Sequence, residues 1–309
     1  MKSIELKAEE RAFLNYVTGR VVETRAGEVG LSQGENGAII PPTIASKIIQ
    51  KLHDISPLYQ LSDQYSVSGE IHIPYYDESS QELVVSYAEE FEELESTSGK
   101  LLTVKLDGFL SGVLTKVSKS LFYNSQFNII EFVVNAMAKS IHKWLEKELI
   151  NSTPNKIAGL TTVTQKITAD SATAVTADEL IELQEMIIDD YQLNAVWIMN
   201  RETRKAIRKL KDFQGRYLLV PDLNARWGYT LLGREVYTTA SMSKMTAGAT
   251  VIYYGDFSGL AVQFPEKIEV NVLTEKYLDQ HAIGVISWIE VDSKVEDTSK
   301  IVKLEMASA

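Results

Sequence analysis

The sequence contains no cysteine, which removes several classes of chemistry at once. Without thiols the chain has no disulfides, no thiolate-bound metal and no cysteine nucleophile, and it fits manufacture in a reducing cytoplasm. Long apolar runs are absent too, since no stretch approaches the roughly 18 uninterrupted apolar residues of a membrane-spanning helix. The first residues, MKSIELKAEERAFLNYV, lack the apolar segment of a signal peptide. We therefore expect a soluble protein with no membrane partner.

Lysine and arginine are missing from residues 52–99, although the 309-residue chain contains 31 of them. The acidic residues of this segment equal the formal net charge of the entire chain, −11, so the remainder is neutral in sum. A sequence pI near 5.0 argues against a free nucleic-acid-binding protein. The acids of the segment are Asp54, Asp63, Glu70, Asp77, Glu78, Glu82, Glu89, Glu90, Glu92, Glu93 and Glu95.

Five of these acids cluster in SYAEEFEELEST, residues 86–97: Glu89, Glu90, Glu92, Glu93 and Glu95. Consecutive glutamates on an extended segment cannot converge on Ca²⁺ as the alternating ligands of a calcium loop do. Two interpretations stay open. The cluster is either a solvated acidic face or a candidate contact with basic groups on another subunit.

Motifs for catalysis or metal binding are scarce. The four histidines, His53, His72, His142 and His281, fall in different expected elements without the paired spacing of a metal site. The glycines of residues 19–37 do not form a phosphate-binding loop, because they neither follow a strand nor precede GK[ST]. In GDFSG, residues 255–259, the serine is one place away from its position in a hydrolase elbow. We expect no catalytic residue, no cofactor and no metal.

A basic cluster occupies RETRKAIRKLKD, residues 201–212. Arg201, Arg204, Lys205, Arg208 and Lys209 recur at the spacing of one helix face. A nucleic-acid patch is one interpretation, although the segment lacks interleaved aromatic residues, and an ordinary solvated helix face is the commoner one. A third is that these residues contact acidic surfaces of another subunit.

Hydrophobic periodicity predicts an α+β fold. The dominant element is a helix over residues 127–150, about 36 Å long at about 1.5 Å per residue. A strand over 101–117 is expected to bend near Gly108 and Gly112, and 65–76 with 82–88 to form a hairpin that leads into the acidic cluster. The other expected elements are helices at 4–18, 42–54, 177–191 and 201–212, strands at 195–200, 230–238 and 249–254, and a mostly extended tail at 261–304.

The order of these segments resembles the major capsid protein family of tailed bacteriophages, which has the Hong Kong 97-type fold. The matching segments are GENGAIIPPTIASKIIQKLHDISPLYQL (34–61), the strand-to-helix passage at 102–150, GLTT (159–162), AVWIMNRETRKAIRKLKD (195–212), WGYTLLGREVYTTASM and VIYYGDFSG. The resemblance implies an N-terminal arm (1–38), an extended loop (66–100), a peripheral domain with a long spine helix (39–65, 101–176 and 256–290) and an axial domain (177–255 and 291–309).

The resemblance also implies a function. It describes a non-enzymatic protein whose pentamers and hexamers build an icosahedral shell around a DNA genome, with scaffolding, portal and protease proteins as partners and non-specific contact with packaged DNA. Such a protein belongs to the virion and is assembled in the cytoplasm of the bacterial host. Some relatives crosslink a loop lysine to a distant asparagine, which we do not expect here because residues 52–99 have no lysine. Two alternatives are an encapsulin-type nanocompartment shell and, from another class, an α+β hydrolase with an unrecognised site.

Changing the glutamates at 89, 90, 92, 93 and 95 to glutamine distinguishes the two interpretations of the acidic cluster. If the cluster docks on a basic surface of another subunit, wild-type association should weaken between about 0.1 and 1 M salt, as the screening length falls from about 10 Å to about 3 Å. The glutamine variant should associate less and lose most of that salt dependence. The assembled fraction is measured as a function of salt concentration. Equal slopes for both proteins would favour the interpretation of the cluster as a solvated acidic face.

Overall fold

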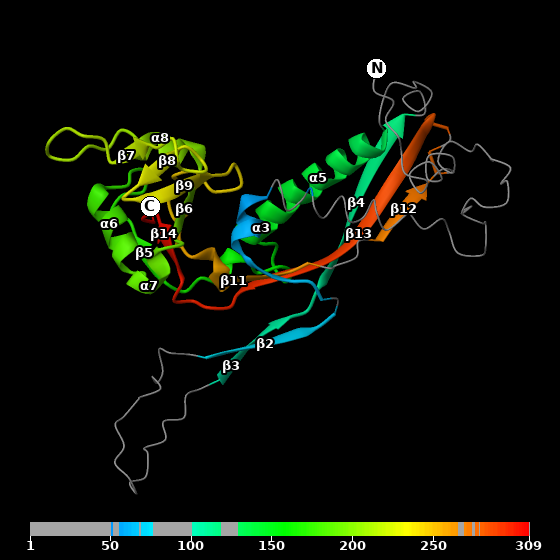
Figure 1. The fold of residues 1–309 in the computed structure, drawn as a ribbon, viewed down its shortest axis with the longest axis horizontal. Helices are drawn as coiled ribbons and strands as arrows, with labels where there is room; N and C mark the ends of the chain where they lie inside the picture. The colour runs from blue at the N-terminus through cyan, green and yellow to red at the C-terminus, as the bar shows by residue number, and fades with distance from the viewer. Residues whose placement is uncertain are drawn as a thin grey trace, which may run out of the picture.

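The computed structural model describes residues 51, 56–67, 69–76, 101–118, 129–264, 269–273, 276–277 and 279–308. The helices expected at 4–18 and, apart from Lys51, at 42–54 lie outside these residues. So do the glycine-rich arm, the strand expected at 82–88 and the five clustered glutamates. The described part contains a lobe built on a seven-stranded sheet, an elongated part formed by a long helix and long strands, and a hairpin that projects away from both (Figure 1).

The lobe is organised by a mixed sheet with the strand order β5-β14-β10-β6-β9-β8-β7. Its central strand β6 is the apolar run VWIM, and all four residues are buried, as expected for a strand covered on both faces. Trp197 packs on Tyr254 and donates from Nε1 to the carbonyl of Leu231 at 3.0 Å. The strand bounds are β5 Lys166–Thr168, β6 Val196–Met199, β7 Leu219–Pro221, β8 Tyr229–Leu231, β9 Arg234–Thr238, β10 Thr250–Gly255 and β14 Ile301–Glu305.

Two helices, α6 (Ala177–Glu185) and α8 (Arg201–Ile207), pack on one face of this sheet. Thr176 starts α6 with a capping box, in which its side chain accepts from the Glu179 N–H while the Glu179 carboxylate accepts from the Thr176 N–H. The helix predicted over 177–191 is wrong in extent, because it breaks after α6 and resumes as α7 (Asp189–Gln192). The Gln192 amide caps the break by donating to the carbonyls of Gln184 (3.3 Å) and Ile187 (3.0 Å).

The elongated part is organised by β13 (Ala282–Val295), the longest strand described. Its first ten residues pair antiparallel with β4 (Phe109–Ser118), its middle pairs with β12 (Glu269–Leu273), and its end pairs with β11 (Leu260–Gln263). A short strand, β1 (Asp63–Tyr65), adds in parallel to β11. The extended tail predicted over 261–304 is confirmed by these strands and β14.

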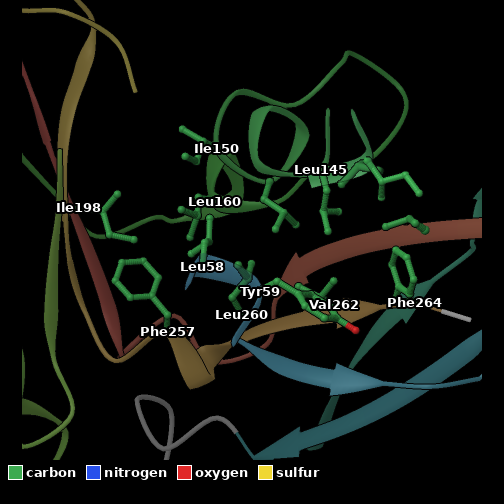
Figure 2. Packing of buried hydrophobic residues seen from close by; sticks show 14 of the residues in the cluster. Leu58, Tyr59, Leu145, Ile150, Leu160, Ile198, Phe257, Leu260, Val262 and Phe264 are labelled. Atoms are coloured by element: carbon green, nitrogen blue, oxygen red, sulfur yellow. The ribbon is translucent and has the colours of Figure 1, made fainter. Parts of the chain in front are cut away.

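The predicted long helix is confirmed as α5 (Ile129–Asn151), although its expected first residues, 127 and 128, lie outside the described part. Its apolar stripe is buried at Val133, Val134, Met137, Ile141, Leu145 and Leu149. Figure 2 shows Leu145 and Ile150 of α5 facing Leu58 and Tyr59 of α3 (Pro57–Leu61), with Val262 and Phe264 at β11 beside them.

The same core continues into the lobe. Figure 2 shows Ile198 of β6 pointing toward Phe257 of the 3-10 helix η2 (Phe257–Gly259). Side chains alternate along β6, so Val196 and Ile198 face this core while Trp197 and Met199 face α6 and α8. The sheet is therefore covered on both sides, and one of its covers is the elongated part.

The projecting hairpin pairs β2 (Ile71–Tyr76) with β3 (Leu101–Leu106), antiparallel, from Ile71 opposite Leu106 to Tyr76 opposite Leu101. The partner strand expected for 65–76 was 82–88, whereas the strand that pairs with β2 in the structure is 101–106. The predicted bend near Gly108 is confirmed, since Gly108 has φ +67° and separates β3 from β4. Gly112 instead lies inside β4, where a Cβ would meet the Trp288 ring at 2.8 Å.

Both connections from the hairpin to the body are held by buried polar side chains. Asp292 of β13 is fully buried, and its carboxylate accepts from the N–H groups of Asp107 and Ser293, each at 2.8 Å. Gln263 of β11 donates from Nε2 to the carbonyls of Val67, at 2.9 Å, and Gly69. Burial raises the pKa of Asp292 above the usual aspartate range, and the two N–H groups oppose that rise.

Gly159 permits the close approach of α5 to β13. Its φ is +49°, its N–H donates to the Ser293 carbonyl at 2.8 Å, and an added Cβ would lie 2.3 Å from the Leu149 carbonyl oxygen. We expect Gly159→Ala to lower the free energy of unfolding by about 3 kcal/mol or more, because backbone must move. Gly233→Ala, at φ +79° with nothing near its Cβ, should lose only about 1–2 kcal/mol in urea titrations. Equal losses would contradict the close-approach argument.

Asp292 should give the subunit a pH-dependent stability. Because its pKa is raised in the folded state, it favours folding below about pH 4, the unfolded aspartate value, and this contribution is lost as the pH rises through the folded pKa. The stability difference between wild type and Asp292→Asn should therefore shrink from pH 4 upward in urea unfolding. Asp107→Asn is the control with opposite sign, since the Lys105 ammonium lowers the pKa of Asp107. A pH-independent difference for Asp292→Asn would refute the assignment.

Candidate assembly surfaces

The described part of the hairpin carries an exposed charge network. The Lys105 ammonium lies 2.9 Å from the Asp107 carboxylate and 3.2 Å from Glu70, and His72 Nε2 lies 2.6 Å from Glu70. These hydrogen bonds lower the pKa of Glu70 and raise the pKa of Lys105. Being exposed, the network adds little to stability. Lys105, the one lysine of the described hairpin, is therefore already paired with the carboxylates of Glu70 and Asp107.

The predicted basic residues lie on α8 and the turn that follows it. Asn200 caps the helix by accepting from the Glu202 N–H at 3.0 Å. Arg201 and Lys205 are exposed, and Arg204 is half-buried. Arg208 is the C-terminal cap and Lys209 follows it, and both are exposed. The five residues therefore share one region of the surface.

The helix predicted over 201–212 is wrong in length, because α8 ends at Ile207. The Lys209 and Leu210 N–H groups bond carbonyls three residues back, which tightens the last turn. The chain then reverses at Gly215, where φ is +81°. The Asp212 carboxylate stabilises this reversal by accepting from the N–H groups of Gln214 and Arg216 at 2.9 and 2.8 Å.

Tyr229 of β8 is the residue that the sequence did not reveal. The guanidinium carbons of Arg204 and Arg208 lie 4.9 and 5.3 Å from the centre of its ring, and Arg208 also donates to its hydroxyl at 3.2 Å. Lys211 lies over the ring of Tyr217 at 4.8 Å in the same way. Aromatic rings therefore lie among the basic residues after all: Tyr217 comes from the turn that follows α8, and Tyr229 comes from β8. The spacing of the basic residues in the sequence does not indicate the contact with Tyr229.

The acids near α8 are already paired. Glu202 bonds the Lys244 ammonium at 2.9 Å, and Asp212 bonds Arg216 Nε at 2.8 Å. The Arg216 contacts lower the pKa of Asp212. In the part of the chain that the structure describes, none of the five predicted basic residues takes part in an ion pair. We define the basic surface as α8 with the segment 208–223.

Large apolar side chains are exposed on this basic surface. Phe213 and Leu223 are essentially fully exposed, and Tyr217 and Val220 are 55% and 51% exposed. Clustered exposed apolar side chains beside charges are typical of protein contact sites. Sequence reasoning missed these residues, because they stand in an irregular segment without periodicity.

The lobe is fixed to α5 by a buried polar contact. The Tyr237 hydroxyl of β9 donates to the Glu146 carboxylate, and burial, with the nearby carboxylate, raises the pKa of Tyr237. Trp227 packs on the Tyr237 ring with 5.3 Å between centroids, and His142 lies 3.9 Å from Glu146. The contact therefore sets the position of the basic surface relative to the rest of the subunit.

Within the described ranges, no group of histidine and acidic side chains could hold a metal ion. No helix of those ranges is long and apolar enough to cross a membrane. The polar groups that the fold concentrates lie at the hairpin connections and on the basic surface. This distribution suits contacts with other macromolecules.

The comparisons with known proteins agree with this arrangement. Residues 36–306 match the phage capsid family. No curated protein sequence matches the chain.

Three solved structures illustrate the fold. The chain is similar to the capsid of an empty GTA particle computed with C5 symmetry, at 20% identity and TM-score 0.68, covering 96% of this chain and 99% of that one. The capsid of the native GTA particle gives 20% identity and TM-score 0.66, with 94% and 97% covered. Microbacterium phage Oxtober96 gives 15% identity and TM-score 0.59, with 89% and 96% covered.

The predicted α+β, Hong Kong 97-like fold is thus confirmed, and nothing in these matches supports a nanocompartment shell or a hydrolase. The family is structural rather than enzymatic, and its members are components of particles. Since the match spans most of the sequence, the chain belongs to the phage capsid family, as a major capsid protein of a tailed phage or phage-like particle.

Proposed function

We propose that this chain assembles through pentamers and hexamers into an icosahedral shell around a DNA genome, in the cytoplasm of a bacterial host. The observation that carries the proposal is the β2–β3 hairpin, which projects from the body and is held at its root (Figure 1). A projecting two-stranded arm is only marginally stable by itself and gains its stabilisation by packing on another molecule. The C5 symmetry of the related GTA capsids supports rings of copies.

The domain assignment is part of the proposal. The lobe with the seven-stranded sheet corresponds to the axial domain, expected at 177–255 and 291–309. The part with α5, β4 and the N-terminal portion of β13 corresponds to the peripheral domain, expected at 39–65, 101–176 and 256–290. The extended loop, expected at 66–100, includes β2, and residues 1–38 are the N-terminal arm. The pairing of β3 with β2 extends this loop to residue 106, beyond the expected boundary with the peripheral domain.

The five clustered glutamates, at 89, 90, 92, 93 and 95, would then meet basic groups in trans. The only lysine of the described hairpin, Lys105, is already neutralised by Glu70 and Asp107. Opposite charge on a neighbouring copy orients an arriving subunit more than it adds affinity. Contact with packaged DNA is non-specific, and scaffolding, portal and protease proteins complete the set of partners.

Electron microscopy of the purified full-length chain tests assembly directly. Closed icosahedral particles are expected, and particles collected from the natural host should hold nuclease-protected DNA. Particles filled with a protein cargo instead of DNA would favour a nanocompartment. A chain that stays monomeric under all assembly conditions would contradict the proposal.

The hairpin register permits a sharper variant. Because Tyr76 and Leu101 are direct cross-strand partners, residues 77–100 can be replaced by a two-residue Asn-Gly turn without shifting the pairing. The shortened chain should melt within a few degrees of wild type, since the body of the subunit is unchanged, yet fail to form closed particles. Normal particle yield from the shortened chain would show that the loop is dispensable for assembly.

A further inference from the structure

We propose that neighbouring copies of this chain contact each other head to tail through their seven-stranded lobes. The surface of α6 and α7 on one copy lies against the basic surface on the next. The proposal rests on the proposed function, in which copies form rings, and names the residues that make the contact between lobes.

The α6–α7 surface is acidic. No lysine or arginine occurs between Lys166 and Arg201. Five acids of α6 and α7 are exposed, and in the described part of the chain none of them takes part in an ion pair: Asp178, Glu182, Glu185, Asp189 and Asp190. These acids outnumber the two cations that contact the surface, Arg234 at the Leu193 carbonyl and Lys300 over the Tyr191 ring. A surface with such an excess of one sign repels its own copy and attracts the opposite sign.

The α6–α7 surface is also apolar in part. Ile181, Met186, Ile188 and Leu193 are 46%, 37%, 56% and 77% exposed. With the four exposed apolar residues of the basic surface, they make up most of the large exposed apolar side chains in the described ranges. Apolar groups next to charges are what a contact needs, because charge complementarity selects the partner while apolar burial holds it.

The two surfaces lie at different places on the lobe. Figure 1 shows α7 on one side and the segment around β7 and α8 on another, both away from α5. A contact between two different surfaces on identical copies is heterologous, and it closes into a ring when the rotation between copies allows. Contact of either surface with itself is disfavoured by like charge. The geometry and the charge therefore both select a head-to-tail arrangement.

Charge exchange on the two surfaces tests the contact. Lys205→Glu with Lys209→Glu lowers the charge of the basic surface by four units, and Glu182→Lys with Glu185→Lys raises the charge of the α6–α7 surface by four units. All four positions are exposed, so melting temperatures should stay near wild type. Each double variant should lose at least about tenfold in assembled fraction near 0.15 M salt, since most of the charge attraction between the two surfaces is removed.

Mixing the two double variants gives a readout that does not require shells. The two double variants should associate with each other, because the unchanged α6–α7 surface of one can meet the unchanged basic surface of the other. Sedimentation measures this association, which should be lost near 1 M salt. Lys143→Glu with Lys147→Glu, on the exposed side of α5, makes the same change in net charge as Lys205→Glu with Lys209→Glu but leaves both lobe surfaces unchanged, so it should keep the assembled fraction of wild type.

The outcomes separate the two proposals. If wild type forms shells and both double variants assemble as well as wild type, the head-to-tail contact is wrong while the shell function stands. If the mixed variants associate but no shell ever forms, the contact stands and the shell function fails. If the mixed variants do not associate, or if the α5 control loses as much assembled fraction as the Lys205→Glu, Lys209→Glu variant, the contact is overturned.

Discussion

The antiparallel ladder of β13 is the interaction on which the rest of the subunit depends. This one strand, Ala282–Val295, bonds β4, β12 and β11 in turn, and its end accepts from the N–H of Gly159 beyond α5. Elements that are far apart in sequence therefore pair with the same strand. Because the apolar stripe of α5 packs over the same sheet, the core continues from the elongated part to the seven-stranded lobe.

The polar contacts are concentrated where parts of the subunit join. Asp292 and Gln263 hold the two connections of the hairpin, and Tyr237 with Glu146 holds the lobe to α5. Buried polar groups of this kind specify one geometry, since each loses its hydrogen bonds if the parts move. A shell needs this directional control, because small errors in the angle between parts repeat with every copy.

Sequence reasoning recovered what local patterns encode. The spacing of Val133, Val134, Met137, Ile141 and Leu145 is enough to predict α5, and the strand at 195–200 is evident from its apolar run. Sequence reasoning failed where residues outside a helix determine where that helix ends. The break after α6 depends on a cap from Gln192, and α8 ends early because Asp212 stabilises a chain reversal.

The candidate contact surfaces were likewise only partly predictable from the sequence. The basic residues of α8 were visible as a helical pattern, whereas the ring of Tyr229 reaches them only through the pairing of β8 in the sheet. Phe213 and Leu223 carry no periodic signal at all. The pairing of β2 with β3 was not predicted, because residues 77–100 intervene between the paired strands and alternation alone cannot measure how far away a partner lies.

Because of the hairpin register, the stability of the fold depends little on the length of the loop that joins Tyr76 to Leu101. Closing a flexible loop becomes less favourable by only about 0.6 kcal/mol each time its length doubles, because the entropy of closure depends on the logarithm of length. The pair Tyr76 and Leu101 marks the boundary beyond which insertions leave the β2–β3 pairing unchanged. Evolution can therefore lengthen or shorten this loop without repacking the core of the subunit, and the same boundary is a place for the display of foreign peptides.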